Sequence, residues 1–295
     1  SNCLSDCSYC FLQNYLNDGR IKVVGDTDAV MKEVKEKTEA EPWRFYRIGT
    51  WELGDSLILE PLTGVASELV EAFVAIKNAV LELKTKSDDI NGLLDLNHGG
   101  RTVIGWSLNP QAVISSEEHG TADLDGRLRA MERVAKAGYL VSLHFDPMIV
   151  HNGWEQGYED LVSQVSQAVP GESIAWISVG SLRFNPEMKK TIEGNFPASR
   201  ITSAEMILGN DGKMRYVKPL RLGLYRLICK AIQKHLDKDI MTYLCMERWD
   251  VWKRIFGYSP RSSGHLDYIF TASLYKRFPV LVHQAPDLSL YDPQT

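Results

Sequence analysis

Near its first residue the chain carries a set of cysteines that is the part of the sequence best suited to chemistry. Cys3, Cys7 and Cys10 follow the spacing C-x3-C-x2-C. Cysteine thiolates hold iron–sulfur clusters, and four cysteines saturate a cluster that only transfers electrons. Three thiolates would hold three corners of a [4Fe–4S] cluster and leave the fourth iron able to bind another molecule. The spacing therefore predicts an iron–sulfur cluster with one open coordination position.

Two other roles for these cysteines are less favoured. A tetrahedral zinc site uses four ligands, and the nearest histidine in the sequence is His98. A disulfide framework uses an even number of closely spaced cysteines, whereas this chain has 5 in 295 residues. The remaining cysteines, Cys229 and Cys245, lie far downstream. The cluster is the preferred interpretation.

The cysteine motif, followed by the aromatic residue Phe11, resembles the signature of the radical S-adenosylmethionine (SAM) superfamily. The resemblance implies that the amino and carboxylate groups of SAM chelate the fourth iron. It also implies that one-electron reduction cleaves SAM to methionine and a 5′-deoxyadenosyl radical, so an external reductant such as a flavodoxin or ferredoxin is an expected partner. Reduced cysteines and an oxygen-sensitive cluster predict a cytoplasmic protein.

Composition and charge exclude several classes of protein. The chain is 44% hydrophobic and 24% charged, which is ordinary for a soluble globular protein. No apolar run is long enough to cross a bilayer, and we expect no membrane partner. With a net charge of −5 the chain has no general attraction for nucleic acid, so DNA binding would need a local basic patch. Such a patch is offered by Lys213, Arg215, Lys218, Arg221 and Arg226, which can equally be the solvated face of a helix.

The elements that would position these residues alternate between apolar strands and amphipathic helices. The patterns predict strands over residues 44–50, 80–85, 102–108, 139–145, 174–179 and 240–245. They predict helices over residues 26–38, 66–77, 88–94, 125–137, 157–168 and 220–236. Several of the strands are near-continuous apolar runs, which is typical of a parallel sheet covered by helices. Repeated strand–helix units of this kind curl into a full or partial barrel.

We therefore predict an α/β fold, a partial (β/α)6 TIM-like barrel of the radical SAM type, in residues 1–184. Residues 185–295 would form a C-terminal helical or irregular extension that packs on the barrel. A strand is expected directly before the cysteine loop, and none is present in the sequence. We therefore expect the natural chain to start upstream of residue 1.

Polar residues follow the predicted strands, at the edge of a parallel barrel where reacting groups lie. Glu52 could accept hydrogen bonds from the amino group of SAM, and the cation of Lys86 suits its carboxylate. Ser107 and Asn109 offer a hydroxyl and an amide to a ribose or a carboxylate. The plainer interpretations are a solvated acidic loop, a surface lysine and an Asn-Pro turn.

Two further residues at predicted strand ends are candidates for substrate binding. His144 lies near the end of one strand, and Arg183 follows the next and could hold an anionic group. A lone histidine is more often a hydrogen-bonded structural residue. A surface arginine is often paired with a nearby carboxylate, so both interpretations stay open.

With the strand ends in view, the chain resembles the spore photoproduct lyase family of radical SAM proteins, which in spores reverse a thymine–thymine lesion in DNA. The resemblance extends from Cys3 to about Tyr216. It rests on the segments 3–13, 85–86, 106–109, 125–128, 137–139, 153–155 and 157–158. Only the cysteine motif is specific, and the other segments count because they occur in order.

This resemblance implies a set of contacts to the cofactors and the substrate. Those to the cluster come from Cys3, Cys7 and Cys10, those to SAM from Tyr9, Lys86 and Ser107, and those near the lesion from Arg215 and Tyr216.

Two positions depart from the family pattern. The true lyases place a hydrogen-donating cysteine where this chain has Gly49, and a tyrosine where it has Phe11. Neither residue can pass a hydrogen atom, so the same relay cannot operate here. Residues 49–52 instead look like the glycine–glutamate loop that contacts the amine of SAM in the superfamily, which supports Glu52. Cys245 could replace the missing donor, although a cysteine is more often a buried structural thiol.

Together these observations predict a lyase-like radical SAM enzyme that abstracts hydrogen from a substrate, with a DNA lesion or modified base as the leading hypothesis. A lesion enzyme needs basic contacts to phosphates and a way to extrude the damaged base. An enzyme acting on a small molecule or peptide is the second hypothesis, favoured by the acidic net charge and the missing relay. A non-catalytic iron–sulfur protein is the third.

Overall fold

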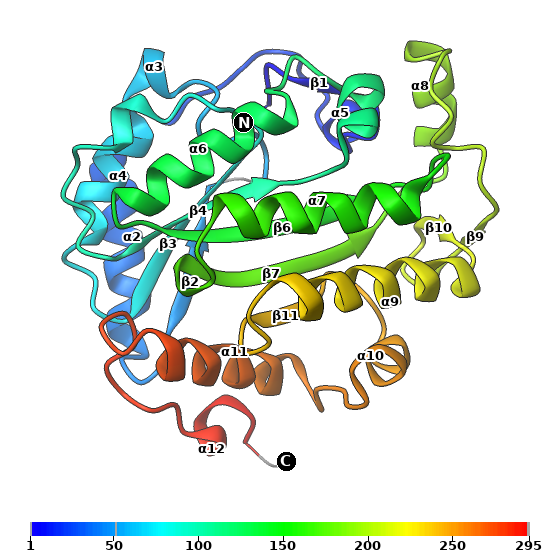
Figure 1. Ribbon diagram of the computed structural model, residues 1–295. Coiled ribbons are helices and arrows are strands. Elements are labelled where there is room, and N and C mark those ends of the chain that lie inside the picture. Colours follow the sequence, from blue (N-terminus) through cyan, green and yellow to red (C-terminus); the bar gives the residue numbers. More distant parts are fainter. Residues whose placement is uncertain (1, 51, 294–295) are drawn as a thin grey trace.

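The computed structural model describes residues 2–50 and 52–293. Six parallel strands form one curled sheet in the order β11, β7, β6, β4, β3, β2 (Figure 1). They are β2 (Tyr46–Gly49), β3 (Ala79–Thr85), β4 (Thr102–Ser107), β6 (Leu140–Met148), β7 (Ile174–Ser181) and β11 (Met241–Leu244). Within the described residues no ladder joins β2 to β11. The barrel is therefore partial, as predicted.

Helices cover the outer face of this sheet (Figure 1). They are α2 (Thr27–Ala40), α4 (Val65–Phe73), α6 (Leu124–Lys136), α7 (Trp154–Ala168) and α9 (Lys218–His235). The start of α2 is capped by Asp26, which accepts a hydrogen bond from the Ala29 N–H at 2.9 Å. α7 begins three residues earlier than predicted because Gly153, with φ of 75°, lets the chain turn directly into the helix. The other predicted helices are confirmed to within a few residues, except that residues 88–94 contain only the short 3-10 helix η1 (Asn91–Leu93).

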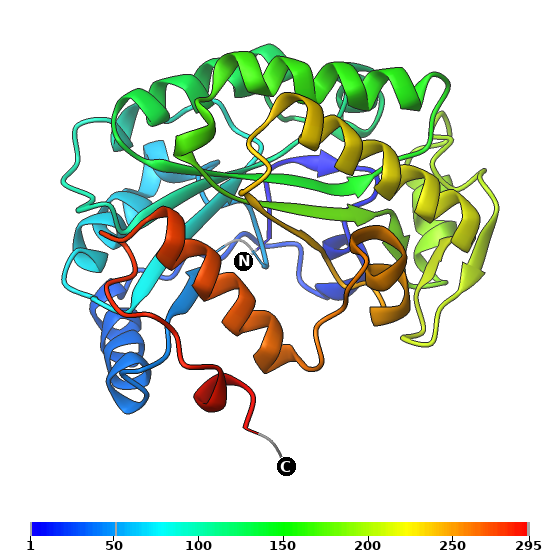
Figure 2. The same ribbon diagram turned by 60° about the horizontal axis from the view of Figure 1, so that its bottom comes forward.

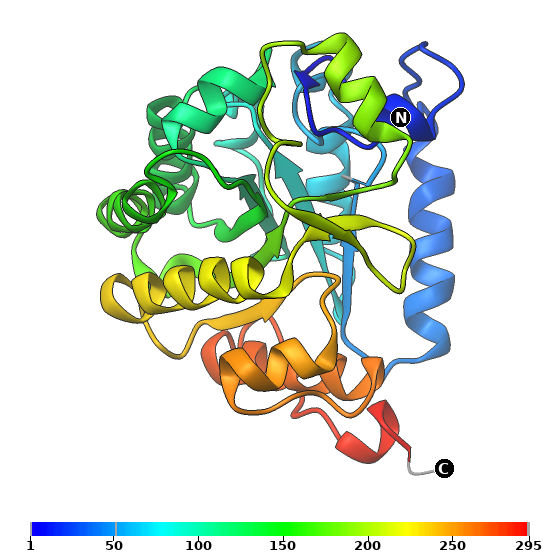
Figure 3. The same ribbon diagram turned by 90° about the vertical axis from the view of Figure 1, so that its right-hand side faces the viewer.

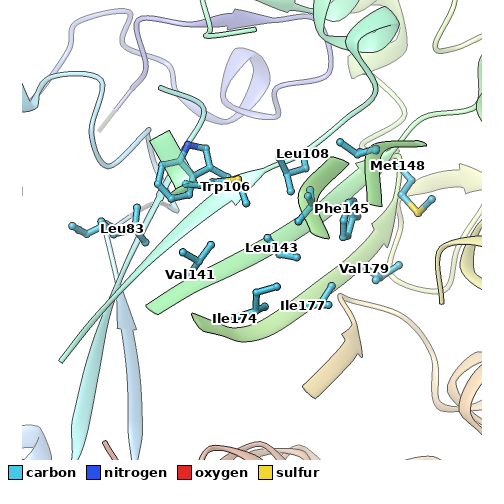
Figure 4. Close-up of a cluster of buried hydrophobic side chains, with 14 of the residues drawn as sticks. Leu83, Trp106, Leu108, Val141, Leu143, Phe145, Met148, Ile174, Ile177 and Val179 are labelled. Atoms are coloured by element: carbon cyan, nitrogen blue, oxygen red, sulfur yellow. The ribbon is translucent and has the colours of Figure 1, made fainter. Parts of the chain in front are cut away.

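Side chains alternate between the two faces of the sheet. On β6, Val141, Leu143 and Phe145 are fully buried and belong to the large hydrophobic core between sheet and helices (Figure 4). On β3 the inward positions are taken by Glu82 and Lys84, between the buried leucines of the same strand. The outer face therefore carries the larger hydrophobic core, while the interior of the barrel carries these charged side chains together with a smaller hydrophobic cluster that includes Val80, Trp176 and Phe270.

Shorter elements lie around the barrel. β1 (Asp6–Cys7) pairs with β5 (Glu118–His119), and β8 (Arg183–Phe184), β9 (Met206–Leu208) and β10 (Met214–Tyr216) form a small antiparallel sheet. The remaining helices are α1 (Leu12–Tyr15), α3 (Glu60–Thr63), α5 (Gln111–Glu117), η2 (Gly171–Ser173), α8 (Met188–Asn195), α10 (Trp249–Phe256), α11 (Ser263–Arg277) and α12 (Leu288–Tyr291). Figure 3 shows α8 beside the N-terminal loop, where Asn195 Nδ2 donates to Gln13 Oε1 at 3.1 Å. Among the described residues no helix is both long and apolar enough to span a membrane.

The C-terminal part of the chain contributes to the barrel itself. β11 is the sixth strand of the sheet, and α11 lies across the side between β11 and β2 (Figure 2). Phe270 of α11 packs against Trp176 of β7 and Tyr243 of β11, with ring centroids 5.3 and 5.8 Å apart. The guanidinium of Arg47, on β2, lies 3.7 Å from the centroid of the same phenylalanine ring. Residues after 184 therefore help to complete the barrel, and the division of the chain at residue 184 stays a prediction.

A buried hydrogen-bond network crosses the barrel interior at the middle of the sheet. Glu82 Oε1 accepts hydrogen bonds from Ser142 Oγ at 2.8 Å and from His144 Nε2 at 2.7 Å. Trp176 Nε1 donates to the same oxygen at 3.2 Å. A Cβ atom at position 105 would lie 2.6 Å from Ser142 Oγ, so only Gly105 leaves room for the network. Although burial opposes ionisation, the charge and hydrogen bond of His144 lower the pKa of Glu82 to about 2.

Replacing Glu82 by glutamine should make the fold less sensitive to acid. A carboxyl with a pKa of about 2 when folded and an ordinary value of 4.5 stabilises the fold fully above pH 4.5 and loses this contribution as the pH falls toward 2. We expect Glu82→Gln to lower the free energy of unfolding at pH 7 by about 2 kcal/mol, the usual contribution of hydrogen bonds to a charged group. Urea unfolding as a function of pH measures this. If the variant loses stability in acid as steeply as the unmodified chain, the assignment of an ionised Glu82 is wrong.

Candidate active site

The cysteine loop is fixed to the carboxyl edge of the barrel by a short antiparallel pair. β1 pairs with β5, which places Cys7 opposite Glu118. The Ser8 N–H donates to the Glu117 carbonyl at 2.9 Å, and the Ser8 hydroxyl donates to the Glu117 carboxylate. Gln13 Nε2 donates to the carbonyls of Cys7 and Ser8 at 3.1 and 3.0 Å. Hydrogen bonds on both sides therefore hold the loop in a defined conformation.

All the cysteines of this loop are free thiols, and they lie close enough for their charges to interact. Cys7 is buried, whereas Cys3 and Cys10 are half-buried. Burial raises the pKa of Cys7 to about 12, an effect that the positive charge of Lys86 opposes. Burial also raises the pKa of Cys10, and there the Leu12 N–H opposes it by hydrogen bonding to the sulfur. In the part of the chain that the structure describes, no three cysteine, histidine or acidic side chains gather closely enough to hold a single metal ion.

This donor set suits an iron–sulfur cluster better than a single ion. In a cluster the thiolates bind different iron atoms, so they need not converge on one point. The Lys86 ammonium and the Leu12 N–H favour the thiolate form that ligation requires. Soft sulfur donors on a rigid loop therefore fit a [4Fe–4S] cluster held by Cys3, Cys7 and Cys10.

A buried ion pair lies directly beside the cysteine loop. Arg127 and Glu118 are 2.6 Å apart, and neither side chain is exposed. Glu118 Oε1 also accepts hydrogen bonds from the Tyr9 hydroxyl at 2.5 Å and from Asn109 Nδ2 at 2.9 Å. Arg127 donates in addition to the Ser107 carbonyl at 2.8 Å. Although burial opposes ionisation, the charge of Arg127 lowers the pKa of Glu118. Through these hydrogen bonds the ion pair holds three of the predicted SAM-binding residues, Tyr9, Asn109 and Ser107.

Lys86 follows β3 and reaches the cysteine loop. Its Nζ lies 5.7 Å from the centroid of the Tyr9 ring. The Lys86 N–H donates to Asp55 Oδ2 at 2.7 Å, which fixes the backbone at this point. Although burial lowers the pKa of Lys86, the nearby Cys7 thiol and the Glu118 carboxylate raise it above its usual value. A charged ammonium is therefore held beside the cysteines, as the prediction of a SAM-carboxylate contact requires.

The loop after β2 packs against both β3 and the N-terminal segment. The Ser56 N–H donates to the Lys84 carbonyl at 3.0 Å, at the carboxyl end of β3. A Cβ atom on Gly54 would lie 2.8 Å from the Asn2 carbonyl oxygen, so the close approach of the two segments requires a glycine. Glu52 is exposed in this loop, and its role toward the amine of SAM stays a prediction.

The positions that depart from the family pattern, Gly49 and Phe11, lie on different elements. Gly49 is the last residue of β2 and pairs with Glu82 of β3. Phe11 is 47% exposed, and its ring packs edge-on against Tyr15. Trp51, in the predicted SAM-amine loop, lies outside the described residues. Glycine has no thiol and phenylalanine has no O–H, so the role of Cys245 as a replacement donor stays a prediction.

A second charged group lies at the carboxyl ends of β6, β7 and β11. Arg183 donates to the two carboxylate oxygens of Asp146 at 3.0 and 3.2 Å. Its NH2 also donates to Cys245 Sγ at 3.4 Å, on the residue that follows β11. Lys84 is close enough to Asp146, Cys245 and Lys86 for their charges to interact. Lys84 thus lies near this charged group, while Lys86, two residues further along, lies near Cys7 of the cysteine loop.

Two predicted substrate residues lie deeper than expected. His144 is in the middle of β6, which continues to Met148, and it is buried in the hydrogen-bond network of Glu82. The prediction that a strand ends at residue 145 was wrong, and His144 points into the barrel instead of standing at its edge. Tyr216 is fully buried, and its hydroxyl accepts a hydrogen bond from the Val150 N–H at 3.1 Å. Substrate binding by either residue stays a prediction.

Most of the predicted basic cluster is neutralised by carboxylates. Arg215 and Arg221 both pair with Glu247, at 3.6 and 2.9 Å. Lys218 pairs with Asp250. A phosphate-binding patch needs positive charge that no carboxylate compensates. These paired residues therefore form an ion network within the protein and not a free basic patch.

A cavity of about 460 Å³ lies between the β9–β10 hairpin, α9 and α10. Its lining includes Arg215, Arg221 and Glu247 together with the apolar Leu208 and Met246. Within the described residues, the buried Nε of Arg215 has no hydrogen-bond partner. The volume is within the range of small-ligand sites. Because Met246 and Glu247 directly follow the cysteine at the barrel mouth, the cavity adjoins that mouth.

Sequence reasoning missed Glu118, Arg127 and Asp146. The available signal was strongest for Arg127, which lies on the same helical stripe as the buried Leu124 and Leu128 of α6. An arginine on an apolar stripe requires a buried partner, but nothing in the sequence identifies that partner as Glu118.

A partial parallel barrel that carries free cysteines in a C-x3-C-x2-C loop at its carboxyl edge defines the radical SAM class of enzymes.

The family model for spore photoproduct lyase matches residues 1–247, and the chain belongs to this family. It is 28% identical over 244 residues to the spore photoproduct lyase of Bacillus subtilis (strain 168), covering 82% of this chain and 69% of the relative. The lyase of Geobacillus sp. (strain Y412MC61) is 28% identical over 248 residues, which cover 83% and 71% of the two chains. A spore photoproduct lyase complexed with dinucleoside spore photoproduct superposes with a TM-score of 0.76 and 26% identity, over 83% of this chain and 75% of that one. A mutant lyase with bound AdoMet and the same dinucleoside has a TM-score of 0.75. The predicted family, fold and enzyme class are confirmed.

Breaking the buried ion pair should destabilise the chain strongly. Replacing Arg127 by methionine removes the ion-pair partner of the buried Glu118 carboxylate, so we expect the free energy of unfolding to fall by about 3 kcal/mol. Adding Glu118→Gln removes that charge, and the double variant should be at least about 1 kcal/mol more stable than the sum of the single effects predicts. Urea unfolding of the three variants measures this coupling. Additive effects would show that the two side chains do not interact.

Proposed function

We propose that this radical SAM enzyme removes hydrogen from a nucleic-acid lesion or modified base, and that Cys245 returns a hydrogen atom to the product. The observation that supports this most directly is that the cysteine loop and the Cys245 thiol lie at the same edge of the barrel, where Lys86 is close to Cys7 and Lys84, two residues earlier in the chain, is close to Cys245. An oxygen-sensitive cluster suits the reducing cytoplasm, with a flavodoxin or ferredoxin as the external electron donor.

The cysteine loop would hold the [4Fe–4S] cluster through Cys3, Cys7 and Cys10, and when bound this cluster supplies the electron that cleaves SAM. The remaining residues of the edge bind and orient SAM.

Most of the predicted SAM-binding residues have a chemical group that is available to contact SAM. The charged Lys86 ammonium can bind the carboxylate of SAM, and the exposed Glu52 can accept from its amine. Because the Tyr9 hydroxyl is already bound to Glu118, the ring of Tyr9 is the part that can contact SAM. The Ser107 hydroxyl can contact the ribose or carboxylate, since Arg127 occupies only the Ser107 carbonyl. Asn109 is held by Glu118 and Tyr158, so it would act chiefly by fixing the shape of the site.

The position of Cys245 supports its role as the replacement donor. β2 and β11 are the two edge strands of the sheet, and they approach each other where the Arg47 guanidinium lies 5.7 Å from the Tyr243 ring centroid. Gly49 stands two residues after Arg47, and Cys245 two residues after Tyr243. Because the two strands run in the same direction, both positions reach the same part of the barrel mouth. The Cys245 thiol, directly after β11, can therefore reach the part of the barrel mouth that a thiol at position 49 of β2 would reach.

The base-lesion substrate is supported by the relatives, whose structures contain dinucleoside spore photoproduct. The cavity beside Cys245 offers the buried Arg215 guanidinium for a polar group and Leu208 and Met246 for an apolar one. In this proposal Arg183 and Arg215 bind polar groups of the substrate, while His144 and Tyr216 support the walls of the site.

A small molecule or peptide is the second candidate substrate. The neutralised basic cluster favours it, because the carboxylates of Glu247 and Asp250 remove the charge that would attract phosphates.

The donor assignment predicts isotope transfer from solvent. Thiol hydrogens exchange with water, so in deuterated buffer the reconstituted enzyme, given SAM, dithionite and a lesion-containing dinucleotide, should release 5′-deoxyadenosine and place one deuterium in the product. Cys245→Ala should lower this transfer by roughly tenfold or more, which corresponds to about 1.4 kcal/mol in the barrier. Mass spectrometry of the product and of 5′-deoxyadenosine measures both steps.

Cys229→Ala is the matched control, because this thiol lies in α9 and should leave the transfer unchanged. Undiminished deuterium transfer in Cys245→Ala would remove the donor role. Absence of 5′-deoxyadenosine from the unmodified, cluster-loaded chain would favour a non-catalytic iron–sulfur protein.

Salt dependence separates the two substrate classes. Recognition of a lesion in duplex DNA through phosphates should weaken by roughly tenfold or more when salt rises from about 50 to 200 mM, because counterions are released on binding. Fluorescence anisotropy with lesion-containing and undamaged duplexes measures this. No measurable affinity for either duplex, together with turnover of a small molecule or peptide and none of the lesion-containing dinucleotide, would support the second candidate.

A further inference from the structure

The charged group around Cys245 is built from three parts of the fold that are far apart in the sequence. Asp146 belongs to β6, Arg183 to β8, and Cys245 follows β11. The carboxylate and guanidinium form a two-point pair, and only 11% and 14% of these side chains are exposed. The NH2 group that donates to Asp146 Oδ2 also donates to the sulfur at 3.4 Å. The thiol is therefore the third member of a largely buried pair of charges.

The backbone gives this group a fixed shape. A Cβ atom at position 180 would lie 2.5 Å from Asp146 Oδ1 and 3.0 Å from Arg183 NH1, so the pair fits only beside a glycine. The Cys245 N–H donates to the Val179 carbonyl at 2.7 Å, which holds the end of β11 against β7. The direction of the thiol is thus set by the sheet and not by a mobile loop.

We propose that Asp146 and Arg183 are positioning residues for the Cys245 thiol. Arg183 holds the sulfur through its N–H, and Asp146 accepts the hydrogen bond of the S–H group, so that the hydrogen stays on the sulfur until it is transferred. This inference rests on the proposed role of Cys245 as hydrogen-atom donor, and it concerns how that donor is kept ready.

The transfer that this arrangement serves balances as follows. The S–H bond of Cys245 breaks and a C–H bond forms on the substrate-centred carbon radical, so one hydrogen atom moves and a sulfur radical remains on Cys245. One electron from the flavodoxin- or ferredoxin-type reductant and one proton restore the thiol. A thiolate has no hydrogen atom to give, which is why the protonated form must be favoured at the barrel mouth.

Charges around the thiol act in opposite directions. Burial raises the pKa of Cys245 to about 12, and the negative charge and hydrogen bond of Asp146 add to this rise. The positive charges of Arg183 and Lys84 lower it. Tyr243, on the same strand, is close enough to interact as well. Removing the carboxylate should therefore favour the thiolate, and removing the guanidinium should favour the thiol.

Alkylation of Cys245 tests the positioning without turnover. In the cluster-loaded chain, iodoacetamide labelling of the Cys245 peptide is followed by mass spectrometry from pH 7 to 10. Asp146→Asn should lower the pKa by about one unit and speed labelling at a fixed pH by roughly tenfold, whereas Arg183→Gln should slow it by roughly threefold or more. Asp211→Asn is the matched control, because its carboxylate pairs with Arg215 and not with the thiol, and it should leave the rate unchanged.

The opposite signs distinguish positioning from loosening of the fold. A variant that merely loosens the barrel mouth exposes the sulfur and speeds labelling in both cases, so faster labelling in both variants, or no change in either, overturns the proposal. In the turnover assay at neutral pH the thiol of Asp146→Asn is still protonated, and loss of the acceptor that orients its S–H group should lower deuterium in the product relative to 5′-deoxyadenosine released. Failure of the donor assignment itself appears separately, as undiminished transfer in Cys245→Ala.

Discussion

The ion pair of Glu118 with Arg127 is the interaction on which the active-site edge depends. Burying two charges costs several kcal/mol each unless every remaining polar atom is bonded. Here Tyr9 and Asn109 satisfy the carboxylate, and backbone carbonyls satisfy the guanidinium. The pair thereby fastens β5 and the cysteine loop to α6 and to the end of β4. The cysteine loop is too short to fold alone, and its contact with the buried Glu118 carboxylate helps to fix its conformation.

The two faces of the sheet differ in polarity. Outward side chains such as Leu143 and Phe145 form the larger hydrophobic core with the helices, and Cys7 and Tyr9 of the cysteine loop belong to the same core. Inward positions carry charge in two levels, Glu82 with His144 at mid-strand and Lys84 with Asp146 nearer the mouth. The lower level is closed by α11, so the charged groups above it are shielded from solvent on that side. Low dielectric in such a space strengthens each pairing and fixes each side chain.

Much of the fold could be predicted because its signals are local. The strand around Ile177 is a nearly continuous apolar run, the strand around Leu81 alternates apolar with charged residues, and the helices carry a clear period. The cysteine loop was equally visible, since its residues are adjacent in sequence. What could not be predicted depends on contacts between distant segments, such as the pairing of Arg183 with Asp146 or the place of α11 across the open side. The inward depth of His144 was misjudged for the same reason, because a strand's end is set by its neighbours and not by its own composition.

A partial barrel has two free edges, and this has a chemical consequence. In a closed barrel a hydrogen-bonded ladder joins the first and last strands, whereas here side chains such as Arg47, Tyr243 and Phe270 bridge β2 and β11. Side-chain bridging constrains the two strand ends less than a ladder would, so residues at both ends can face the same space. A group missing from one edge can then be supplied from the other without rebuilding the barrel. Gly49 and Cys245 lie at such a pair of strand ends. The charged residues beside the thiol are Asp146, on β6 between the two edge strands, and Arg183, which follows β7.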